Sequence, residues 1–418
     1  MGSYQPTSEL GWIDFSDNSR KKMLKVLEAL DGKGVIDELG IGSIRNAFSN
    51  KLFPATSTLM TRSKYYLFIP YILKDFLKDK NAKDAKVYLK QKEEWLIKKL
   101  IEGMGSRSLE KSGIIGYTIY QKSERLAAQP PSAIYWGGIR KLGLYQGESS
   151  LANYLEQLNK IKQNQYKVEQ ISDSQSDLDN ENINGDVSLL SVPVEPHWKD
   201  NPSMELTEIE QSFLIHKVND FFQESLLGYL LNNKNKTLAL VVSEVENISQ
   251  LEKELIDHSR KHHIPAIILK TLYHANRFWE VIRGAHLLFN VELHKRSKVD
   301  QITRKEWKNW QLRMKEMDWG KFDMEWFWKT VAEETRINPG TMAFVNTWFE
   351  RAKNGDFNDE ELVELVERQE RSIKGKRAKL YNIKDVRYTK VEGLTRMEFR
   401  FGNVKGLIKD IIKIPENA

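Results

Sequence analysis

The chain lacks cysteine altogether. This absence excludes disulfide bonds, thiolate zinc sites, iron–sulfur clusters and cysteine nucleophiles. Long apolar runs are missing too: no run in the first 30 residues has the length of a signal peptide, and no stretch approaches the roughly 20 apolar residues of a membrane span. We therefore expect a cytoplasmic protein without a membrane partner, in which any metal would need His and carboxylate ligands.

Familiar catalytic motifs are also missing. The sequence contains no GxxxxGK phosphate loop, no G-x-S-x-G nucleophile elbow and no H-E-x-x-H zinc motif. The nearest approach to a nuclease signature is Glu398-Phe399-Arg400, which has Arg where Lys would be expected. No residue can be named as catalytic on this basis, although carboxylates scattered through the fold could still form a metal-dependent nuclease.

One histidine cluster has the spacing of a metal site. His258 and His262 are four residues apart, which places two imidazoles on one face of a helix, and Glu254 or Asp257 could reach as a third ligand. The surrounding run HSRKHH is, however, as basic and polar as a solvated helix end. We expect neither a metal site nor a cofactor.

Basic charge is concentrated in the first third of the chain. The formal net charge is +6, but residues 1–163 contain 26 Lys and Arg against 17 Asp and Glu. Residues 164–203 contain 2 against 8, and the remainder 36 against 33. A basic domain beside an acidic segment favours contact with a phosphate backbone, because such contacts are electrostatic and need no particular fold. The alternative is a lysine-rich surface that is only solvated.

Composition divides the chain into four parts. Residues 164–203 include a stretch dense in Ser, Asp and Asn and poor in large apolar groups, which predicts a linker. We predict a basic helical N-terminal domain over 1–163, a Trp-rich helical domain over 204–380, and a β-hairpin with a closing helix over 381–418. The predicted fold is mainly α and multidomain, with the small C-terminal hairpin as an α+β element.

Apolar spacing predicts several helices in the N-terminal domain. They cover residues 20–30, 43–50 and 86–102, a stretch from the Thr56-Ser57-Thr58 cluster to about Lys78, and a stretch after Pro130-Pro131 that Gly143 ends. Pro70 is expected to bend or split its helix. The succession of short helices predicts a domain that resembles a helix-turn-helix.

Further patterns describe the second half of the chain. Thr207 and Glu210 form a capping-box pair ahead of a long helix over 209–230, and another helix is expected over 265–294. Seven of the eleven tryptophans lie between residues 279 and 348, which predicts a helical core with large aromatic side chains. Alternating residues over 386–391 and 394–401, on either side of Glu392-Gly393, predict the β-hairpin, and Asn403 is expected to cap the closing helix.

Three basic groups are the candidate DNA contacts. Hydroxyls and cations at the start of the helix after Thr56 suit phosphate oxygens, and a short basic helix end follows Tyr135-Trp136. The basic run 371–379 is either a backbone-contact patch or a solvated loop. For the first two groups the alternatives are helix capping and core packing. The candidate residues are Arg45, Arg62, Lys64, Arg140, Lys141, Lys374, Lys376 and Arg377.

Four blocks carry a family resemblance: GWIDFS at residues 11–16, DELGIGSIRNAF at 37–48, LFPATSTLMTRSKYYLFIPYIL at 52–73 and SAIYWGGIRKLGLY at 132–145. With them the chain resembles a bacterial domain-of-unknown-function family that has a G-W-(I/L/V)-D-(F/Y)-S opening and an L-F-P-x-T-S-T block. Weaker similarity covers residues 278–290 and 397–412. Ala55 stands where relatives have Gly, so a glycine-dependent turn is not assured.

The resemblance implies a cellular setting without naming a reaction. Relatives of this kind occur beside helicase and nuclease genes in mobile defence islands, which implies an accessory role in anti-phage DNA restriction. We therefore expect a non-catalytic DNA-binding or scaffolding subunit of a bacterial defence complex, with DNA and a helicase or nuclease subunit as partners. The alternatives are the metal-dependent nuclease and a structural subunit that binds only protein.

Overall fold

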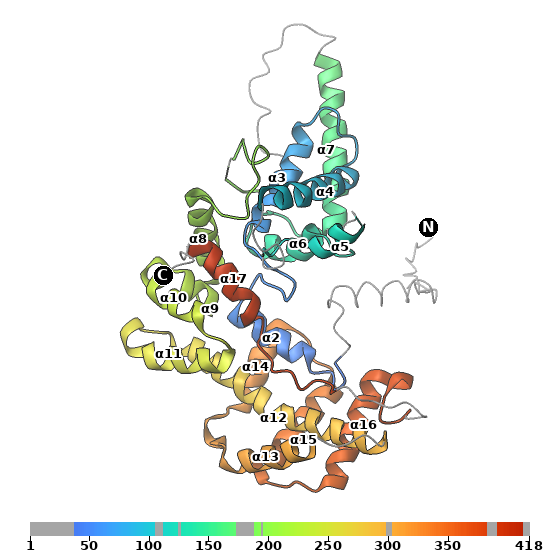
Figure 1. Cartoon of the computed structure of the whole chain (residues 1–418), viewed down its shortest axis with the longest axis vertical. Coiled ribbons are helices and arrows are strands. Elements are labelled where there is room, and N and C mark those ends of the chain that lie inside the picture. Colours follow the sequence, from blue (N-terminus) through green and yellow to red (C-terminus); the bar gives the residue numbers. More distant parts are fainter. Residues whose placement is uncertain are drawn as a thin grey trace, which may run out of the picture. The chain divides into compact units, whose positions relative to one another are not determined.

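The computed structural model describes residues 37–104, 112–123, 127–172, 188–193, 195–297, 303–382 and 391–412. Contacts within the chain separate residues 1–37 from a compact unit of residues 38–418, and the description below concerns that unit. The elements found in the described ranges are α-helices and short 3₁₀ helices, and no strand occurs in those ranges (Figure 1). The mainly α fold is confirmed. The predicted helix over residues 20–30 lies outside the described residues.

The N-terminal helices mostly follow the predicted boundaries. They are α2 (Gly42–Leu52), α3 (Tyr65–Lys78), α4 (Ala85–Met104), α5 (Tyr117–Ser123), α6 (Pro131–Lys141) and α7 (Leu151–Ser172). Pro70 lies within α3, which continues through it from Tyr65 to Lys78. The comparison of this region with a helix-turn-helix stays a prediction.

The segment before α3 is a loop, where the sequence predicted helix. Thr56 does not cap α3: its hydroxyl donates to the Phe53 carbonyl over 2.6 Å. Ala55 has a φ of +61°, the left-handed conformation that glycine adopts most easily. The Ala55 carbonyl accepts a hydrogen bond from the Tyr66 hydroxyl over 2.7 Å. The turn that was expected to depend on glycine therefore has Ala55 in the left-handed conformation in this chain.

The C-terminal part of the predicted linker packs against the helices before it. Trp198 is buried, and its ring lies 5.8 Å from Phe68 on α3 and 5.9 Å from Trp95 on α4. Leu190 forms an isolated antiparallel bridge with Tyr145. Residues 173–187 of the predicted linker lie outside the described residues. The division of the chain at 163, 203 and 380 stays a prediction.

Short helices and one long helix make up the second half. They are α8 (Glu208–Phe222), α9 (Leu226–Leu231), η2 (Asn233–Asn235), α10 (Lys236–Glu244), α11 (Ile248–His262), α12 (Ala266–Arg296), α13 (Thr303–Glu316), η3 (Trp319–Lys321), α14 (Met324–Glu334), α15 (Pro339–Asn354), α16 (Asp359–Lys374), η4 (Gly375–Arg377) and α17 (Phe401–Ile412). Thr207 and Glu210 form the predicted capping box at the start of α8. The predicted helix over 209–230 breaks after Phe222, because Ser225 caps a separate α9.

Tryptophan side chains pack around α12. Trp307 stacks on Trp310 with ring centroids 5.0 Å apart, and Trp310 lies 5.8 Å from Trp348. The indole N–H groups of Trp310 and Trp348 donate to the α12 carbonyls of Glu280 and Val281. Large aromatic groups are thus placed in the helical core, and their polar atoms are satisfied by the backbone of the helix they surround.

The predicted C-terminal β-hairpin is wrong. Residues 391–400 contain no strand, and α17 begins at Phe401, inside the predicted second strand; residues 383–390 lie outside the described residues. The alternation of apolar and charged residues in this segment arises because successive side chains contact different neighbours. Glu398 accepts a hydrogen bond from the Ile248 N–H at the start of α11, Phe399 is buried, and Arg400 donates to the Thr56 carbonyl. These side-chain contacts with neighbouring elements hold the segment in position, and pairing with a second strand does not.

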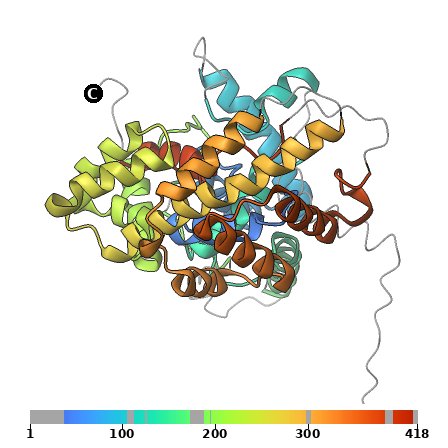
Figure 2. The same ribbon diagram turned by 90° about the horizontal axis from the view of Figure 1, so that it is seen from below.

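The closing helix also starts differently from the prediction. Asn403 lies within α17, and its side-chain amide donates to the carbonyls of Thr58 and Met60, each over 3.0 Å. On its other sides α17 contacts α8, α9 and α10, and both views show it, in red, beside these helices (Figures 1 and 2). The C-terminal helix therefore contacts both the loop before α3 and the helices that follow residue 204.

Glu93 gives the helical core a pH-dependent contact. Its carboxylate is buried on α4 and accepts the Ser132 N–H at the start of α6 over 2.7 Å. Burial raises the pKa of Glu93 to about 7, although the hydrogen bonds from Ser132 favour the charged form. The folded protein therefore holds this proton more tightly than the unfolded chain does.

We expect stability to fall as the pH rises from about 4.5 to about 7, the interval between the pKa of an ordinary glutamate and that of Glu93. The change Glu93→Gln should remove this part of the dependence and make the protein more stable at pH 8 by about 1–3 kcal/mol. Urea unfolding between pH 4.5 and 8 measures it, with the neighbouring Glu94→Gln as control. An equal gain at both ends of the pH range would contradict this assignment.

Candidate functional site

Arg62, a predicted DNA contact, connects three parts of the fold. Its Nε donates to both oxygens of Asp410 on α17, over 2.8 and 3.0 Å. Its Nη1 donates to the Ser112 carbonyl and its Nη2 to the Met204 carbonyl. Asp410 also accepts the Ser63 N–H over 2.7 Å. The guanidinium donors that would bind phosphate are therefore occupied by protein acceptors.

Lys64, the second predicted contact in this group, is only 5% exposed. Its ammonium lies 2.7 and 2.5 Å from the two oxygens of Glu210 on α8. Glu210 also accepts hydrogen bonds from the Tyr71 hydroxyl and the Thr207 N–H. Binding of phosphate by Lys64 would leave a buried carboxylate without its cation, which is costly.

The other predicted contacts fall into an exposed group and a buried one. Arg45, Arg140, Lys141, Lys376 and Arg377 are exposed. The Lys374 side chain is buried, and its ammonium lies 3.0 Å from the buried Glu38 carboxylate. These five residues therefore lie on the surface, whereas Lys374, like Lys64, has a buried carboxylate as partner.

Lys141 borders a cavity of about 870 Å³ between α2, α6, α14 and the end of α8. The charged groups in its lining are three lysines and four carboxylates: Lys51, Lys141, Lys329, Asp220, Glu224, Glu333 and Glu334. Lys51 already pairs with Glu333 over 2.7 Å. The excess of carboxylates makes this cavity unfavourable for an anion.

The histidine pair His258 and His262 lies near Glu254, one of the two expected third ligands. The His258 Nδ1 is 3.7 Å from the Glu254 carboxylate and 2.9 Å from the Glu254 carbonyl oxygen, both of them local contacts within α11. Across the residues that the structure describes, no three His, Asp or Glu side chains gather into a group that could hold a metal ion. None of the described helices is both long and apolar enough to cross a membrane.

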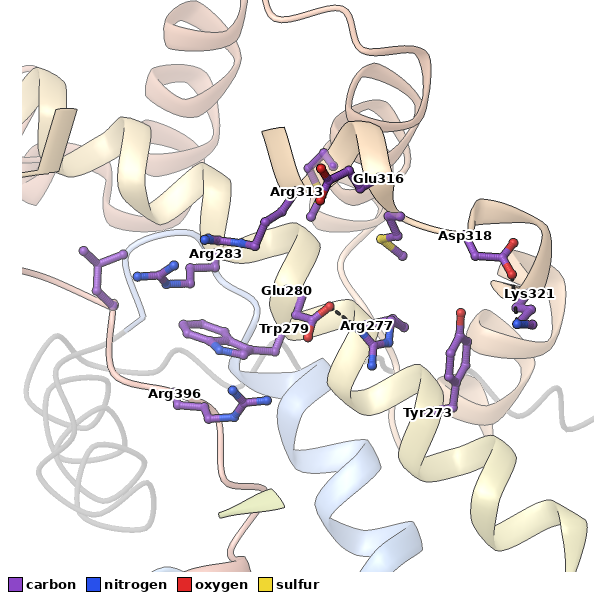
Figure 3. A pocket seen from close by; sticks show the side chains of 13 residues that line it. Tyr273, Arg277, Trp279, Glu280, Arg283, Arg313, Glu316, Asp318, Lys321 and Arg396 are labelled. Atoms are coloured by element: carbon purple, nitrogen blue, oxygen red, sulfur yellow. Dashed lines mark hydrogen bonds and ion pairs between the residues drawn. The ribbon is translucent and has the colours of Figure 1, made fainter. Parts of the chain in front are cut away.

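A second cavity, of about 780 Å³, has a cationic lining, and we call it the arginine cavity. α12, the end of α13, the turn that leads into η3, and the segment 391–400 form its walls (Figure 3). Five cationic side chains line it against three carboxylates: Arg277, Arg283, Arg313, Lys321, Arg396, Glu280, Glu316 and Asp318. This cavity therefore has the charge that an anionic ligand requires.

Carboxylates hold the arginines of α12 in place. Arg277 pairs with Glu280 on its own helix, and Arg283 pairs with Glu306 of α13 over 2.6 Å. Glu306 is not part of the cavity lining, so Arg283 is held from outside the cavity. Because a guanidinium has five N–H donors, one such ion pair leaves further donors for a ligand.

Arg313 and Arg396 line the arginine cavity from elements other than α12. Arg313, near the end of α13, is exposed and makes no hydrogen bond or ion pair with any residue in the described part of the chain. Arg396 donates to the Ser249 hydroxyl, and its Nε lies 3.7 Å from Glu398 Oε1. The Nε atoms of Arg277 and Arg396 have no hydrogen-bond partner among the described residues, but both atoms are buried away from a ligand. Arg313, in contrast, offers donors to the arginine cavity that no described protein acceptor uses.

A glycine brings Arg396 to this position. Gly393 has a φ of +67°, and a Cβ at this residue would lie 2.3 Å from His286 Nδ1 on α12. The neighbouring Glu392 is fixed by Asn290, whose side chain donates to the Glu392 carbonyl and accepts its N–H, each over 2.7 Å. The close approach of segment 391–400 to α12 therefore depends on a residue without a side chain.

Trp279 lies at the centre of the cationic side chains. It is 3% exposed, and in Figure 3 its indole lies between the side chains of Arg283 and Arg396. Tyr273 lines the cavity farther along α12, where the Arg277 guanidinium lies 5.4 Å from its ring centre. An apolar surface beneath the arginines lowers the local dielectric and strengthens their attraction for an anion.

The sequence analysis named none of these arginines as a contact. Arg277, Glu280 and Arg283 follow one another at three-residue spacing, which places them along one face of α12, and this was the available signal. Arg313 and Arg396 join them only in the folded chain. A cavity formed by residues 30 or more positions apart leaves no local pattern in a single sequence.

The geometry defines a helical protein with an arginine-lined cavity suited to an anionic ligand. A family model described as a family of unknown function, DUF6361, matches residues 7–413. The chain therefore belongs to this family, and the expectation of a domain-of-unknown-function family is confirmed. No curated protein and no solved structure matches the chain.

Proposed function

We propose that the protein binds DNA through the arginine cavity and serves as a non-catalytic DNA-binding or scaffolding subunit of a cytoplasmic bacterial anti-phage defence complex. The observation that carries the DNA contact is the excess of cationic side chains in one cavity, among them the exposed Arg313, which has no partner among the described residues. A helicase or nuclease subunit is the proposed protein partner. This part of the proposal rests on the family resemblance, which implies relatives encoded beside helicase and nuclease genes in defence islands.

Arginine is the side chain best matched to a phosphate group. Its planar guanidinium presents paired N–H donors to two oxygens of one phosphate, and it stays charged at all physiological pH values. Most hydrogen bonds between proteins and DNA go to phosphate and sugar, and these contacts fix position without reading sequence. The lining of the cavity supports this mode of contact, in which DNA is bound irrespective of its base sequence.

Two alternatives remain as outcomes of the same experiments. Cleavage of DNA that requires a divalent metal would indicate the nuclease with scattered carboxylates. A stable complex with a helicase or nuclease subunit, together with no affinity for DNA, would indicate a structural subunit that binds only protein.

The change Arg313→Ala is the cleanest test of the DNA contact, because Arg313 is exposed and has no partner in the described chain. We expect about a tenfold weaker affinity for fluorescent DNA, and a slope of log affinity against log salt that is smaller by about one. A salt series with and without magnesium measures both quantities.

Arg336→Ala provides the matched control, since Arg336 is also exposed and lies outside the arginine cavity. This variant should bind DNA as the wild type does. Arg140→Ala tests the basic group predicted from the sequence. If Arg140→Ala weakens binding while Arg313→Ala does not, the DNA contact lies on α6 and the assignment to the arginine cavity is wrong.

A further inference from the structure

We infer that the arginine cavity binds the phosphate monoester at the end of a DNA strand, in preference to the phosphodiesters within a duplex. This inference rests on the proposed DNA binding and specifies its ligand. Three features support it: the size of the cavity, the number of arginines that share it, and the unpaired donors of Arg313.

Size favours an end over a continuous backbone. The volume of about 780 Å³ lies within the range of about 300–1,000 Å³ found for small-molecule sites. Walls from α12, α13 and segment 391–400 bound the space on several sides. A duplex in mid-strand presents its phosphates along a continuous ridge, and such a ridge requires an open track. A strand end can enter a bounded cavity with its last nucleotide.

Charge favours a monoester over a diester. A phosphodiester carries one negative charge, whereas a phosphate monoester carries about −1.5 to −2 at pH 7 and has three acceptor oxygens. Arg283, Arg313 and Arg396 come from three different segments and line the same cavity. Each guanidinium can donate to a pair of phosphate oxygens. The cationic lining therefore suits the higher charge of a terminal phosphate better than the single charge of a diester.

Arg313 has donors that an incoming phosphate can reach. It is exposed and has no hydrogen-bond or ion-pair partner in the described chain, so its guanidinium can donate to phosphate oxygens without breaking a contact there. Arg277 and Arg283 keep further N–H donors beside their ion pairs. The buried Trp279 adds an apolar surface between Arg283 and Arg396 (Figure 3).

The test uses the full-length protein and single-stranded oligonucleotides of one sequence, each with an internal fluorophore. One carries a 5′-phosphate, one a 3′-phosphate and one hydroxyls at both ends; a circular strand of the same composition has no end. We expect one of the two phosphorylated strands to bind about tenfold more tightly than the hydroxyl strand and the circle, as one strong charge-assisted contact allows. The tighter arm identifies which end is recognised.

Two variants link this preference to the cavity. Arg313→Ala should bring the phosphorylated and hydroxyl strands to equal affinity, and Arg313→Lys, which keeps the charge but loses the fork of donors, should lose most of the preference. Arg336→Ala should keep it in full. Retention of the preference in Arg313→Ala and in a second variant, Arg283→Lys, would place end recognition elsewhere and overturn the inference.

Other outcomes separate the inference from the proposed function. Equal affinity for all four DNAs, weakened equally by Arg313→Ala, would overturn end recognition and leave DNA binding by the cavity intact. Absence of binding to any DNA would overturn both. A free deoxynucleoside monophosphate can be added as a competitor of the phosphorylated strand. If it competes as well as an equal concentration of unlabelled phosphorylated strand, the ligand is a mononucleotide and recognition of a strand end is overturned.

Discussion

Replacement of Lys64 by alanine is expected to lower the free energy of unfolding by about 3–5 kcal/mol, the usual cost of removing one partner of a buried ion pair. Glu210, which is fully buried, would lose the ammonium that lies 2.5–2.7 Å from its oxygens. Its remaining donors, the Tyr71 hydroxyl and the Thr207 N–H, are uncharged. Urea unfolding followed by tryptophan fluorescence measures the change.

A second variant separates the charge from the shape of the site. Lys64→Met combined with Glu210→Gln removes both charges, and the Gln amide can accept from the Thr207 N–H and donate to the Tyr71 hydroxyl, so this variant should be destabilised by only about 1–2 kcal/mol. If Lys64→Ala has the stability of the wild type, the ion pair contributes nothing to the fold. Lys64 would then be free to bind phosphate as the sequence predicted.

Removal of Arg62 is the second large effect that we expect. Arg62→Ala deprives the buried Asp410 carboxylate of its cation and removes one donor from each of the carbonyls of Ser112 and Met204. Burial raises the pKa of Asp410, which shows how poorly this site tolerates the charge, even though Arg62 and the Ser63 N–H favour the ionised form. We expect a loss of about 2–4 kcal/mol, measured by the same unfolding experiment.

Arg62→Lys should recover little of this loss, because a single ammonium cannot reach Asp410 and both carbonyls with the geometry of a guanidinium. Arg62→Ala with Asp410→Asn should be less destabilised than the two single changes added together by about 1–3 kcal/mol, since the double variant leaves no buried charge. Strict additivity would contradict a direct pair between these residues.

Both effects matter for any test of DNA binding. A variant that lacks Arg62 and Lys64 would lose structure together with any phosphate contact, so weaker binding by that variant would carry no information on the interface. Arg313 avoids this difficulty because it has no partner in the described chain. Exposed arginines are the positions at which function can be tested without a change in stability.

The helices could be predicted from the sequence where apolar spacing and end signals agree. α2, α4 and α6 lie close to their predicted ranges, and the Thr207–Glu210 capping box is present. The hairpin could not be predicted correctly, because alternation of side chains arises both in a strand and in an extended segment whose neighbours on each side are helices. Residues 391–400 are of the second kind.

The candidate site was less predictable than the helices. A lysine or arginine cannot be distinguished in the sequence by whether its side chain contacts solvent, a ligand or a carboxylate far along the chain. The partner of Lys64, Glu210, is 146 residues away, and the partner of Arg62, Asp410, is 348 residues away. No pattern near either residue therefore indicated the ion pair. The arginine cavity requires the same kind of long-range information, because it joins α12, α13 and segment 391–400.

The bond between Arg62 and Asp410 also sets an order of events during synthesis. After Arg62 is added to the nascent chain, 348 further residues must follow before its carboxylate partner exists. At about 5–20 residues per second this interval is roughly 20–70 s. Lys64 waits for only 146 residues. For the next 200 residues of synthesis the partner of Lys64 exists and the partner of Arg62 does not, and the arrival of α17 supplies the missing carboxylate.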